Sequence, residues 1–488
     1  MKRIDQLTIT RFLSILFVFF YHSGGGIYIQ WLNFPPFSHI FGSGPTAVAY
    51  LYVLSGFVMS IVYHQPQTKF DVSGYWRTRF IRLYPLYIIS FLLVCFYYLE
   101  FMARIKPWKV LVNIFILQAW WPPYAQSFNY ASWSMTVEIF FYAVFPFFTM
   151  WSYRQSTRKL IRLALFFWGL TQLVYFILWK GYFPAWELLL VYNPIFHLNT
   201  FIMGVVAGIW YLRESPKRPV PSWVNLSVLL LSLVFILGYT ILSNVYRELP
   251  HKLQPIAGLL SPVHAILIVA LALDKTRLAS ILRHPWLVTL GETAYALYIL
   301  HVPVIWLYER ALFSSGVSNP EFVLSATYIP LMLAVGLVCY LYIDPPLRRG
   351  LKRVMDRILV PLVLMDLVIL TVSVYVSFRL RFSEDRTFDS YRQAMLLMFW
   401  SAFILRTVAS VVVNSAGSLV VKESFRLFVL RTTIAVTLGS VMVAGAVYAG
   451  YLAGWIENYP RSIFLLDWVI VLGLSVFTRW LHRRKWAV

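Results

Sequence analysis

Blocks of apolar residues, each about 20 long, alternate with short polar connections along almost the whole chain. A helix rises ~1.5 Å per residue, so such a block spans the ~30 Å hydrocarbon core of a bilayer. Reading the blocks against the helix-breaking and charged residues between them predicts about fourteen membrane-spanning helices. The predicted spans are 8–24, 45–63, 81–99, 134–151, 160–179, 194–212, 222–243, 256–273, 287–308, 322–343, 357–378, 391–413, 427–451 and 462–481.

The composition excludes a soluble globular protein. Of the 488 residues, 60% are hydrophobic and 13% are charged, which is about half the charged fraction of a typical soluble domain. The mean hydropathy is +0.69. The predicted fold class is therefore all-α, a polytopic integral membrane protein with little chain left for a soluble core.

The basic residues are distributed unevenly among the connections. The first connection, 24–45, contains no Lys or Arg, whereas 64–80 contains three. This alternation continues along the chain, and because cytoplasmic loops carry the excess of Lys and Arg, it predicts that both termini are cytoplasmic. Connections 100–109 and 379–392 fit less well, because they are basic although this orientation places them outside.

The formal net charge of +22 would suggest a nucleic-acid partner in a soluble protein. Here the basic residues flank apolar spans, so topology and anionic lipid headgroups explain them, and no nucleic-acid partner is predicted. Cys95 and Cys339 lie inside apolar spans, which excludes a disulfide framework. The basic start and first apolar run resemble a signal peptide, but no cleavage site follows, so we expect an uncleaved first span.

The basic segment 344–357, which begins Asp344-Pro345-Pro346, predicts a division of the chain. Residues 1–350 would form a ten-helix domain and residues 351–488 a four-helix accessory domain. No internal repeat relates the two parts.

Two ionisable residues in the first span are the first candidates for chemistry, because charged groups inside a membrane are costly. Arg11 and His22 are eleven residues apart, which is three helical turns plus roughly 20°. They should therefore lie on one face, about 16 Å apart along the axis. An extended acyl-pantetheine arm has a similar reach, so we expect one continuous passage with Arg11 at the donor phosphates and His22 at the thioester.

Arg11 and His22 also open a series of short motifs in a fixed order, which together cover about residues 5–350. The series comprises Thr8-Ile9-Thr10-Arg11-Phe12 through Phe20-Tyr21-His22; Tyr52-Val53-Leu54-Ser55-Gly56-Phe57; Arg79-Phe80-Ile81-Arg82-Leu83-Tyr84-Pro85; Asn129 to Tyr142 with Trp133-Ser134 and Glu138; Asn193-Pro194 through Gly204; Gly291-Glu292 through His301; and Asp344-Pro345. In this series the chain resembles the membrane acyltransferase-3 family, whose members O-acylate bacterial polysaccharides and related glycans. One departure is that Asp344 stands where the family usually has Glu.

The resemblance implies acyl-CoA, most simply acetyl-CoA, as co-substrate and a glycan or polyprenyl-linked glycan as acceptor. His22 is predicted to be the general base or an acyl carrier, since imidazole titrates near neutrality. Glu138 and Tyr142 share a helical face and would orient the imidazole and donate to the developing oxyanion. Arg79 and Arg82, at a cytoplasmic membrane edge, suit the phosphates of coenzyme A.

Three further residues in these motifs, Ser55, Trp133 and His301, are predicted substrate contacts. The sequence leaves a structural interpretation open beside each functional one. That interpretation is a positive-inside anchor for Arg11, Arg79 and Arg82, a core or interfacial histidine for His22 and His301, a buried hydrogen-bonded pair for Glu138 and Tyr142, and close helix packing for Ser55-Gly56. No metal site is predicted, because the membrane histidines show no ligand spacing and no phosphate-loop, dinucleotide or zinc-protease motif occurs.

The last part of the chain, with Arg406, Arg431 and the run Tyr459 through Asp467, resembles the four-helix membrane portion of polysaccharide-biosynthesis dehydratase/epimerase proteins. The dinucleotide-binding domain of those proteins is not found before Val488. We expect either a bundle that recognises a polyprenyl-linked glycan or a plain anchor. Since an unpaired arginine in a span is costly, Arg406 and Arg431 predict a phosphate or carboxylate partner.

The leading hypothesis is thus an O-acyltransferase of the bacterial inner membrane that moves a short acyl group from cytoplasmic acyl-CoA to a sugar hydroxyl near the outer face. A transporter or flippase of lipid-linked glycans is an alternative, which the absence of repeat symmetry disfavours. A non-catalytic scaffold for glycan assembly is another. A homo-oligomer is left open.

Overall fold

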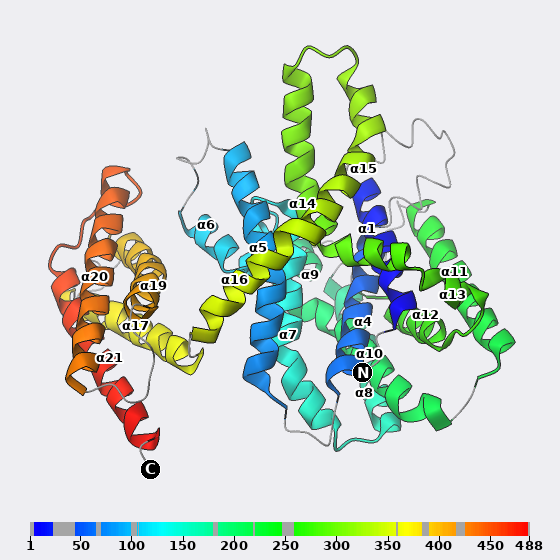
Figure 1. Ribbon diagram of the computed structural model, residues 1–488, viewed down its shortest axis with the longest axis horizontal. Coiled ribbons are helices and arrows are strands. Elements are labelled where there is room, and N and C mark those ends of the chain that lie inside the picture. The colour runs from blue at the N-terminus through cyan, green and yellow to red at the C-terminus, as the bar shows by residue number, and fades with distance from the viewer. Residues whose placement is uncertain are drawn as a thin grey trace. The chain divides into compact units, whose positions relative to one another are not determined.

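The computed structural model describes residues 4–22, 44–64, 70–98, 105, 107–178, 184–217, 220–245, 258–357, 360–382, 390–415 and 425–486. Every regular element within these residues is a helix (Figure 1). The helices are α1 (Thr8–His22), α4 (Gly44–Tyr63), α5 (Val72–Tyr97), α6 (Pro107–Ile114), α7 (Trp133–Ser152), α8 (Thr157–Leu178), α9 (Pro184–Tyr192), α10 (Pro194–Glu214), α11 (Ser222–Val245), α12 (Ser261–Leu273), α13 (Arg277–Leu282), α14 (Pro285–Ser314), α15 (Pro320–Val338), α16 (Asp344–Arg357), α17 (Val360–Arg381), α19 (Arg392–Ser415), α20 (Phe425–Leu452) and α21 (Ile463–Trp486).

A helix lies at every predicted span. In the part of the chain that the structure describes, nine helices are long and apolar enough to cross a membrane, and Ser261–Leu273 and Ile463–Phe477 are shorter apolar helices. The remaining predicted spans coincide with α1, α17 and α19. The predicted class, an all-α polytopic membrane protein, is confirmed.

One helix boundary differs from the prediction in a way that matters for the site. The third span was expected to begin at residue 81, but α5 begins at Val72, because the side chain of Asp71 caps it by accepting from the Gly74 amide at 2.9 Å. Arg79 and Arg82 are therefore inside a helix rather than at its edge. The polar residues of the first turns of α5 hide this start from a hydropathy pattern.

The predicted junction 344–357 is also helical. α15 passes through a π-helix, Cys339–Ile343, into α16. By contacts the chain forms two units: Met1–Met102 with Asn113–Arg348, and Ala103–Val112 with Arg349–Val488.

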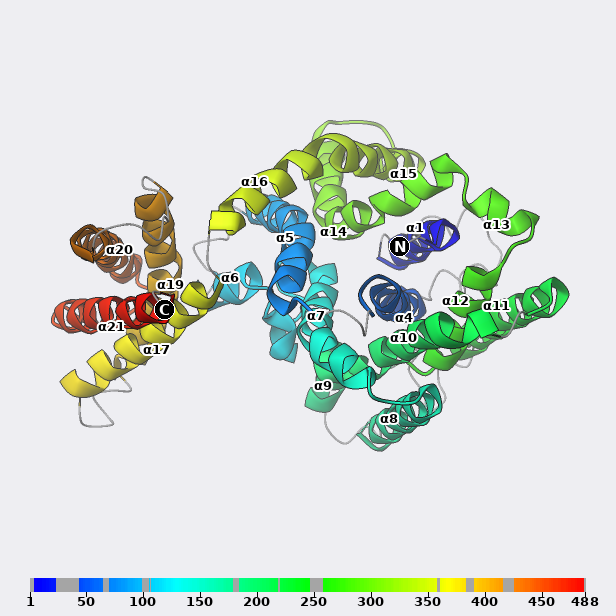
Figure 2. The same ribbon diagram turned by 60° about the horizontal axis from the view of Figure 1, so that its bottom comes forward.

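In the first unit, α1 and α4 lie at the centre, and α14, α5, α7, α10 and α12 surround them (Figure 2). Glycines allow the central helices to approach so closely. A Cβ atom on Gly204 of α10 would lie 1.9 Å from the Val53 carbonyl oxygen of α4, and one on Gly56 would lie 2.3 Å from the Phe201 carbonyl oxygen. These contacts are those of a small-residue interface between membrane helices.

The contact between α1 and α14 is equally close. A Cβ atom on Gly291 would lie 2.1 Å from the Thr8 carbonyl oxygen. This contact fixes the first turn of α1 against α14, which sets the positions of Arg11 and His22 further along α1.

The second unit packs α17, α19, α20 and α21 around a core that includes Phe378, Met398 and Val443. Arg406 of α19 forms a buried ion pair with Asp467 of α21 and donates to the Ser440 hydroxyl at 2.9 Å. The carboxylate partner expected for Arg406 is therefore present.

Gly204→Ala should lower the unfolding temperature of the detergent-solubilised protein, because the added methyl group meets backbone and α4 must shift away from α10; overpacking of this kind costs about 1–3 kcal/mol. Gly238→Ala is the matched control, since no atom lies within 4 Å of its added Cβ, and should leave the temperature unchanged or raise it. Equal unfolding temperatures for Gly204→Ala and the wild type would contradict the close α4–α10 contact.

Candidate functional site

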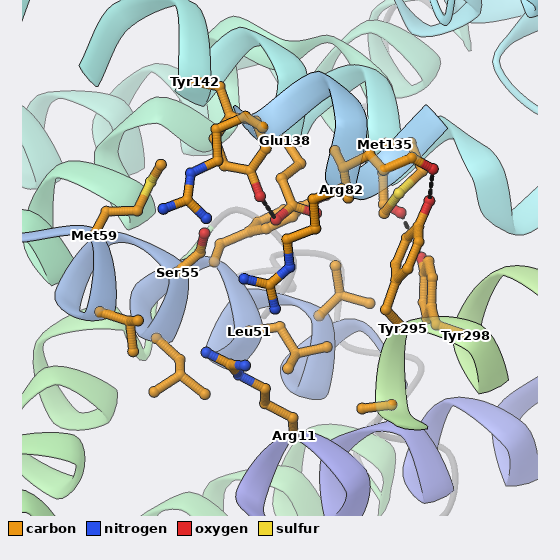
Figure 3. A pocket seen from close by; sticks show the side chains of 18 of the residues that line it. Arg11, Leu51, Ser55, Met59, Arg82, Met135, Glu138, Tyr142, Tyr295 and Tyr298 are labelled. Atoms are coloured by element: carbon orange, nitrogen blue, oxygen red, sulfur yellow. Dashed lines mark hydrogen bonds between the residues drawn. The ribbon is translucent and has the colours of Figure 1, made fainter. Parts of the chain in front are cut away.

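A cavity of about 130 Å³ opens at the centre of the first unit between five helices (Figure 3). This volume holds several water molecules or a phosphate group. Its polar lining residues are Arg11 of α1, Tyr52 and Ser55 of α4, Arg79 and Arg82 of α5, Ser134, Glu138 and Tyr142 of α7, and Tyr295 and Tyr298 of α14. Six of the nine predicted site residues thus share one cavity: Arg11, Ser55, Arg79, Arg82, Glu138 and Tyr142.

Three guanidinium groups converge in this cavity. The side chains of Arg11 and Arg82 point toward one another, from α1 and α5 respectively (Figure 3). Among the described residues, no carboxylate is hydrogen-bonded to either. Two positive charges repel each other strongly when little water screens them. The arrangement of Arg11 and Arg82 therefore favours an anionic ligand between the two guanidinium groups.

Arg79 is held differently, inside a cage of tyrosines. Its guanidinium carbon lies 4.9 Å from the ring centre of Tyr63 and 5.6 Å from those of Tyr75 and Tyr142. Cation–π contacts stabilise a charge that is only 9% exposed. The Nε of Arg79 is fully buried and has no hydrogen-bond partner within the described ranges.

Glu138 is the one carboxylate in the lining of the cavity. It accepts a short hydrogen bond from the Tyr142 hydroxyl (Figure 3). This differs from the expected role of Tyr142. Its hydroxyl was expected to donate to an oxyanion, but it already donates its hydrogen to Glu138. Among the lining residues Glu138 offsets one of the three positive charges, and Glu292, outside the lining, also attracts the charge of Arg11.

Prolines inside the helices help to build the site. Pro146 of α7 cannot donate to the Tyr142 carbonyl oxygen, and the Trp76 indole of α5 donates to it instead at 3.0 Å. Pro303 of α14 leaves the Ile299 carbonyl oxygen free in the same way. Ser90 and Asn129 donate to that oxygen at 2.8 and 2.9 Å. These bonds fix α5 and the start of the Asn129 motif against both helices.

His22 belongs to a second group of polar residues, a pair of hydrogen-bonded imidazoles whose ring planes are nearly parallel. Its Nδ1 is 2.9 Å from Nε2 of His301, and the ring centres are 5.2 Å apart with planes at 7°. Nδ1 of His301 is 2.6 Å from the Tyr298 carbonyl oxygen. The imidazole of His22 therefore has His301 as its partner in the structure, not Glu138 as expected.

These partners fix the protons on both rings. A carbonyl oxygen only accepts, so Nδ1 of His301 carries hydrogen. His301 is 1% exposed, which strongly favours its neutral form, and its Nε2 must then accept from Nδ1 of His22. Neutral His22 consequently presents an unprotonated Nε2. Because both nitrogens of His301 are engaged, the expected role of this residue as a substrate contact does not fit its surroundings.

The arginine cavity and the histidine pair lie along the same two helices. Arg11 and Ile15 of α1 and Tyr295 and Tyr298 of α14 line the cavity, and the histidines follow further along each helix. Among the described residues, however, His22 is not part of the cavity lining. The buried side chains of Val18 and Phe19 occupy this stretch of α1, so the expected continuous passage is not seen.

Trp133 does not line the cavity either. It is 7% exposed and packs against the rings of Tyr192 and His197, 5.3 and 5.4 Å away between centres.

Two tyrosines that the sequence did not single out do line the cavity. Tyr295 donates to the Leu83 carbonyl oxygen at 2.5 Å, and Tyr298 donates to the Ala131 carbonyl oxygen at 3.0 Å. Their spacing with His301, at three-residue intervals, was the available signal.

Comparison with known proteins identifies the family of the chain. The family model of an acyltransferase domain, acyltransferase-3, matches residues 4–341. The acyltransferase MdmB of Streptomyces mycarofaciens is 29% identical over 288 residues, which cover 55% of this chain and 70% of MdmB. The O-acetyltransferase OatA of Staphylococcus aureus is 21% identical over 384 residues, which cover 71% of this chain and 59% of OatA. The match therefore spans little more than half of OatA.

No solved structure matches the chain. The family match extends over more than two thirds of the sequence and contains both the arginine cavity and the histidine pair. The chain belongs to the acyltransferase-3 family of membrane acyltransferases.

Proposed function

We propose that this protein transfers a short acyl group, most simply acetyl, from cytoplasmic acyl-CoA to a hydroxyl of a lipid-linked or surface glycan. The observation that supports this proposal is the unprotonated Nε2 of His22. His22 lies on α1, the same helix that contributes Arg11 to a cavity with an excess of positive charge among its lining residues. The names of the relatives, an acyltransferase and an O-acetyltransferase, support the reaction class.

The arginine cavity supports an anionic donor. Guanidinium groups bind phosphate through paired, charge-assisted hydrogen bonds, and Arg11 and Arg82 converge without a carboxylate on either. The phosphates of coenzyme A would supply the missing negative charge. Glu138 and Tyr142 would hold the neighbouring Arg79 in place.

His22 supplies the base. Its Nε2 accepts the proton of the acceptor hydroxyl as the sugar oxygen attacks the thioester carbonyl. The carbon–sulfur bond then breaks, an oxygen ester forms, and the departing thiolate takes the proton from the imidazolium. Nδ1–H of His22, bonded to His301, keeps the ring oriented through both steps.

The separation of the two groups fits a single donor molecule. Arg11 and His22 are about 16 Å apart along α1, a distance that an extended pantetheine arm covers. The acyl end must pass Val18 and Phe19 to reach His22, so we expect these side chains to move when the donor binds.

The charge pattern supports an orientation with both termini in the cytoplasm, in a bacterial inner membrane. Arg11 then lies toward the cytoplasm, where acyl-CoA is present, and His22 toward the outer face, where the glycan acceptor is.

Purified wild-type protein with labelled acetyl-CoA and a glycan acceptor should release free coenzyme A, and His22→Ala should lower the rate by about 100-fold or more, because it removes the base. His284→Ala is the control, since His284 is an exposed residue at the start of α14, and should retain the wild-type rate. Wild-type turnover by His22→Ala would remove this histidine from the mechanism.

Arg82→Gln should raise the KM for acetyl-CoA about tenfold or more, because it removes a charged contact to phosphate worth about 1.5–3 kcal/mol. With S-acetyl-pantetheine, which lacks the nucleotide phosphates, the same variant should match the wild type. Arg77→Gln, on the same helix but outside the cavity lining, controls for loss of a positive charge. Equal losses with both donors would show that Arg82 supports the fold and not the phosphates.

His301→Ala should lower kcat about 100-fold or more while leaving the KM for acetyl-CoA unchanged, because His22 loses the acceptor that fixes its tautomer. His301→Gln places an amide oxygen near the former Nε2 and should restore much of kcat. Steady-state kinetics and unfolding temperatures of both variants check this. If the two variants lose activity equally at wild-type stability, His301 does not act through an accepted hydrogen bond.

A further inference from the structure

A group of aromatic side chains begins at His22 and continues away from the arginine cavity. Tyr130, in the short 3₁₀ helix Tyr130–Ser132, has its ring centre 4.9 Å from that of His22, edge to face. Trp306 of α14 follows at 5.7 Å from Tyr130, and Tyr97 of α5 at 5.4 Å from Trp306. We call Tyr130, Trp306 and Tyr97 the aromatic platform. All three are partly exposed.

Further contacts support the aromatic platform. Tyr98 packs against Trp306 at 5.6 Å. Arg310 donates to the Tyr97 carbonyl oxygen at 3.3 Å and lies over the Tyr97 ring at 5.9 Å. These contacts join the end of α5 to α14.

Polar groups beside the platform remain available to a ligand. In the described part of the chain, the Tyr130 hydroxyl and the Trp306 indole N–H make no hydrogen bond within the protein, and the Glu309 carboxylate has no cationic partner. Glu309 lies one turn beyond Trp306 on α14 and within electrostatic range of Tyr130. A carboxylate is too costly to face lipid tails, so we expect Glu309 to face water or the headgroup region.

Flat aromatic faces with donors and a carboxylate at their edge are complementary to a sugar ring. The axial C–H groups of a pyranose stack on an aromatic face, while its equatorial hydroxyls reach outward to polar groups. We propose that the aromatic platform and Glu309 bind a pyranose of the acceptor glycan and hold one of its hydroxyls at Nε2 of His22. This assignment rests on the proposed function and adds the class of acceptor and the residues that select it. Trp306, rather than the buried Trp133, is then the tryptophan that contacts sugar.

The test compares two acceptors with acetyl-CoA as donor: p-nitrophenyl β-glycosides, which carry a pyranose, and sorbitol, which offers hydroxyls without a ring. Trp306→Ala should lower kcat/KM for the glycosides about tenfold, mainly through KM, and leave acetyl transfer to sorbitol unchanged. Trp306→Phe keeps a stacking face and should retain most of the wild-type value. Trp223→Ala is the control, because this tryptophan of α11 is 74% exposed.

Binding of the same glycosides without donor, followed by saturation-transfer NMR, separates this inference from the reaction. If the wild type gives binding signals and Trp306→Ala abolishes them, the sugar site is supported. Should the wild type bind the glycosides without transferring acetyl, only the proposed function is contradicted. Glu309→Gln, a smaller change, should weaken the glycoside signals and tests the site where Trp306→Ala fails to fold. Equal transfer to glycosides by Trp306→Ala and the wild type, or equal losses with glycosides and sorbitol, would overturn the assignment.

Discussion

The cost of a bare charge inside a membrane protein is the constraint on which this structure depends. The two units meet it in different ways. In the C-terminal unit, Arg406 is neutralised by Asp467 and buried with it. In the first unit, three arginines and one carboxylate line a cavity. Cation–π contact with a tyrosine ring stabilises the charge of Arg79. This positive charge is what the proposed anionic donor would neutralise.

The same helices that hold the arginines also set the histidine pair. Gly291 brings α14 against the start of α1, and the imidazoles of His22 and His301 meet further along. Pro303 breaks the hydrogen-bond ladder of α14 close to His301, and Ser90 and Asn129 replace the lost donor. The position of the His22 imidazole therefore depends on residues from four segments that are distant in sequence.

The class and a helix at each predicted span follow from pattern alone, because hydropathy acts locally along the chain. The cost of buried charge singled out candidate residues, six of which line one cavity. The rest depends on tertiary contacts. The early start of α5 is set by a capping bond of Asp71 in a polar turn. The pairing of His22 with His301 joins residues 279 apart. The hydrogen bond between Tyr142 and Glu138, one turn apart on α7, is by contrast local, and it is the pair that the sequence left open as the structural interpretation.

The central claim is that one donor molecule joins the two constellations along α1, with phosphates at the arginines and the acyl group at His22. A structure determined with a non-hydrolysable acetyl-CoA analogue tests it most directly. The account predicts phosphate oxygens in contact with Arg11 and Arg82, side chains of Val18 and Phe19 displaced, and the acyl carbonyl beside Nε2 of His22. An analogue bound with its phosphates away from the arginine cavity, or with its acyl end directed away from α1, would contradict it.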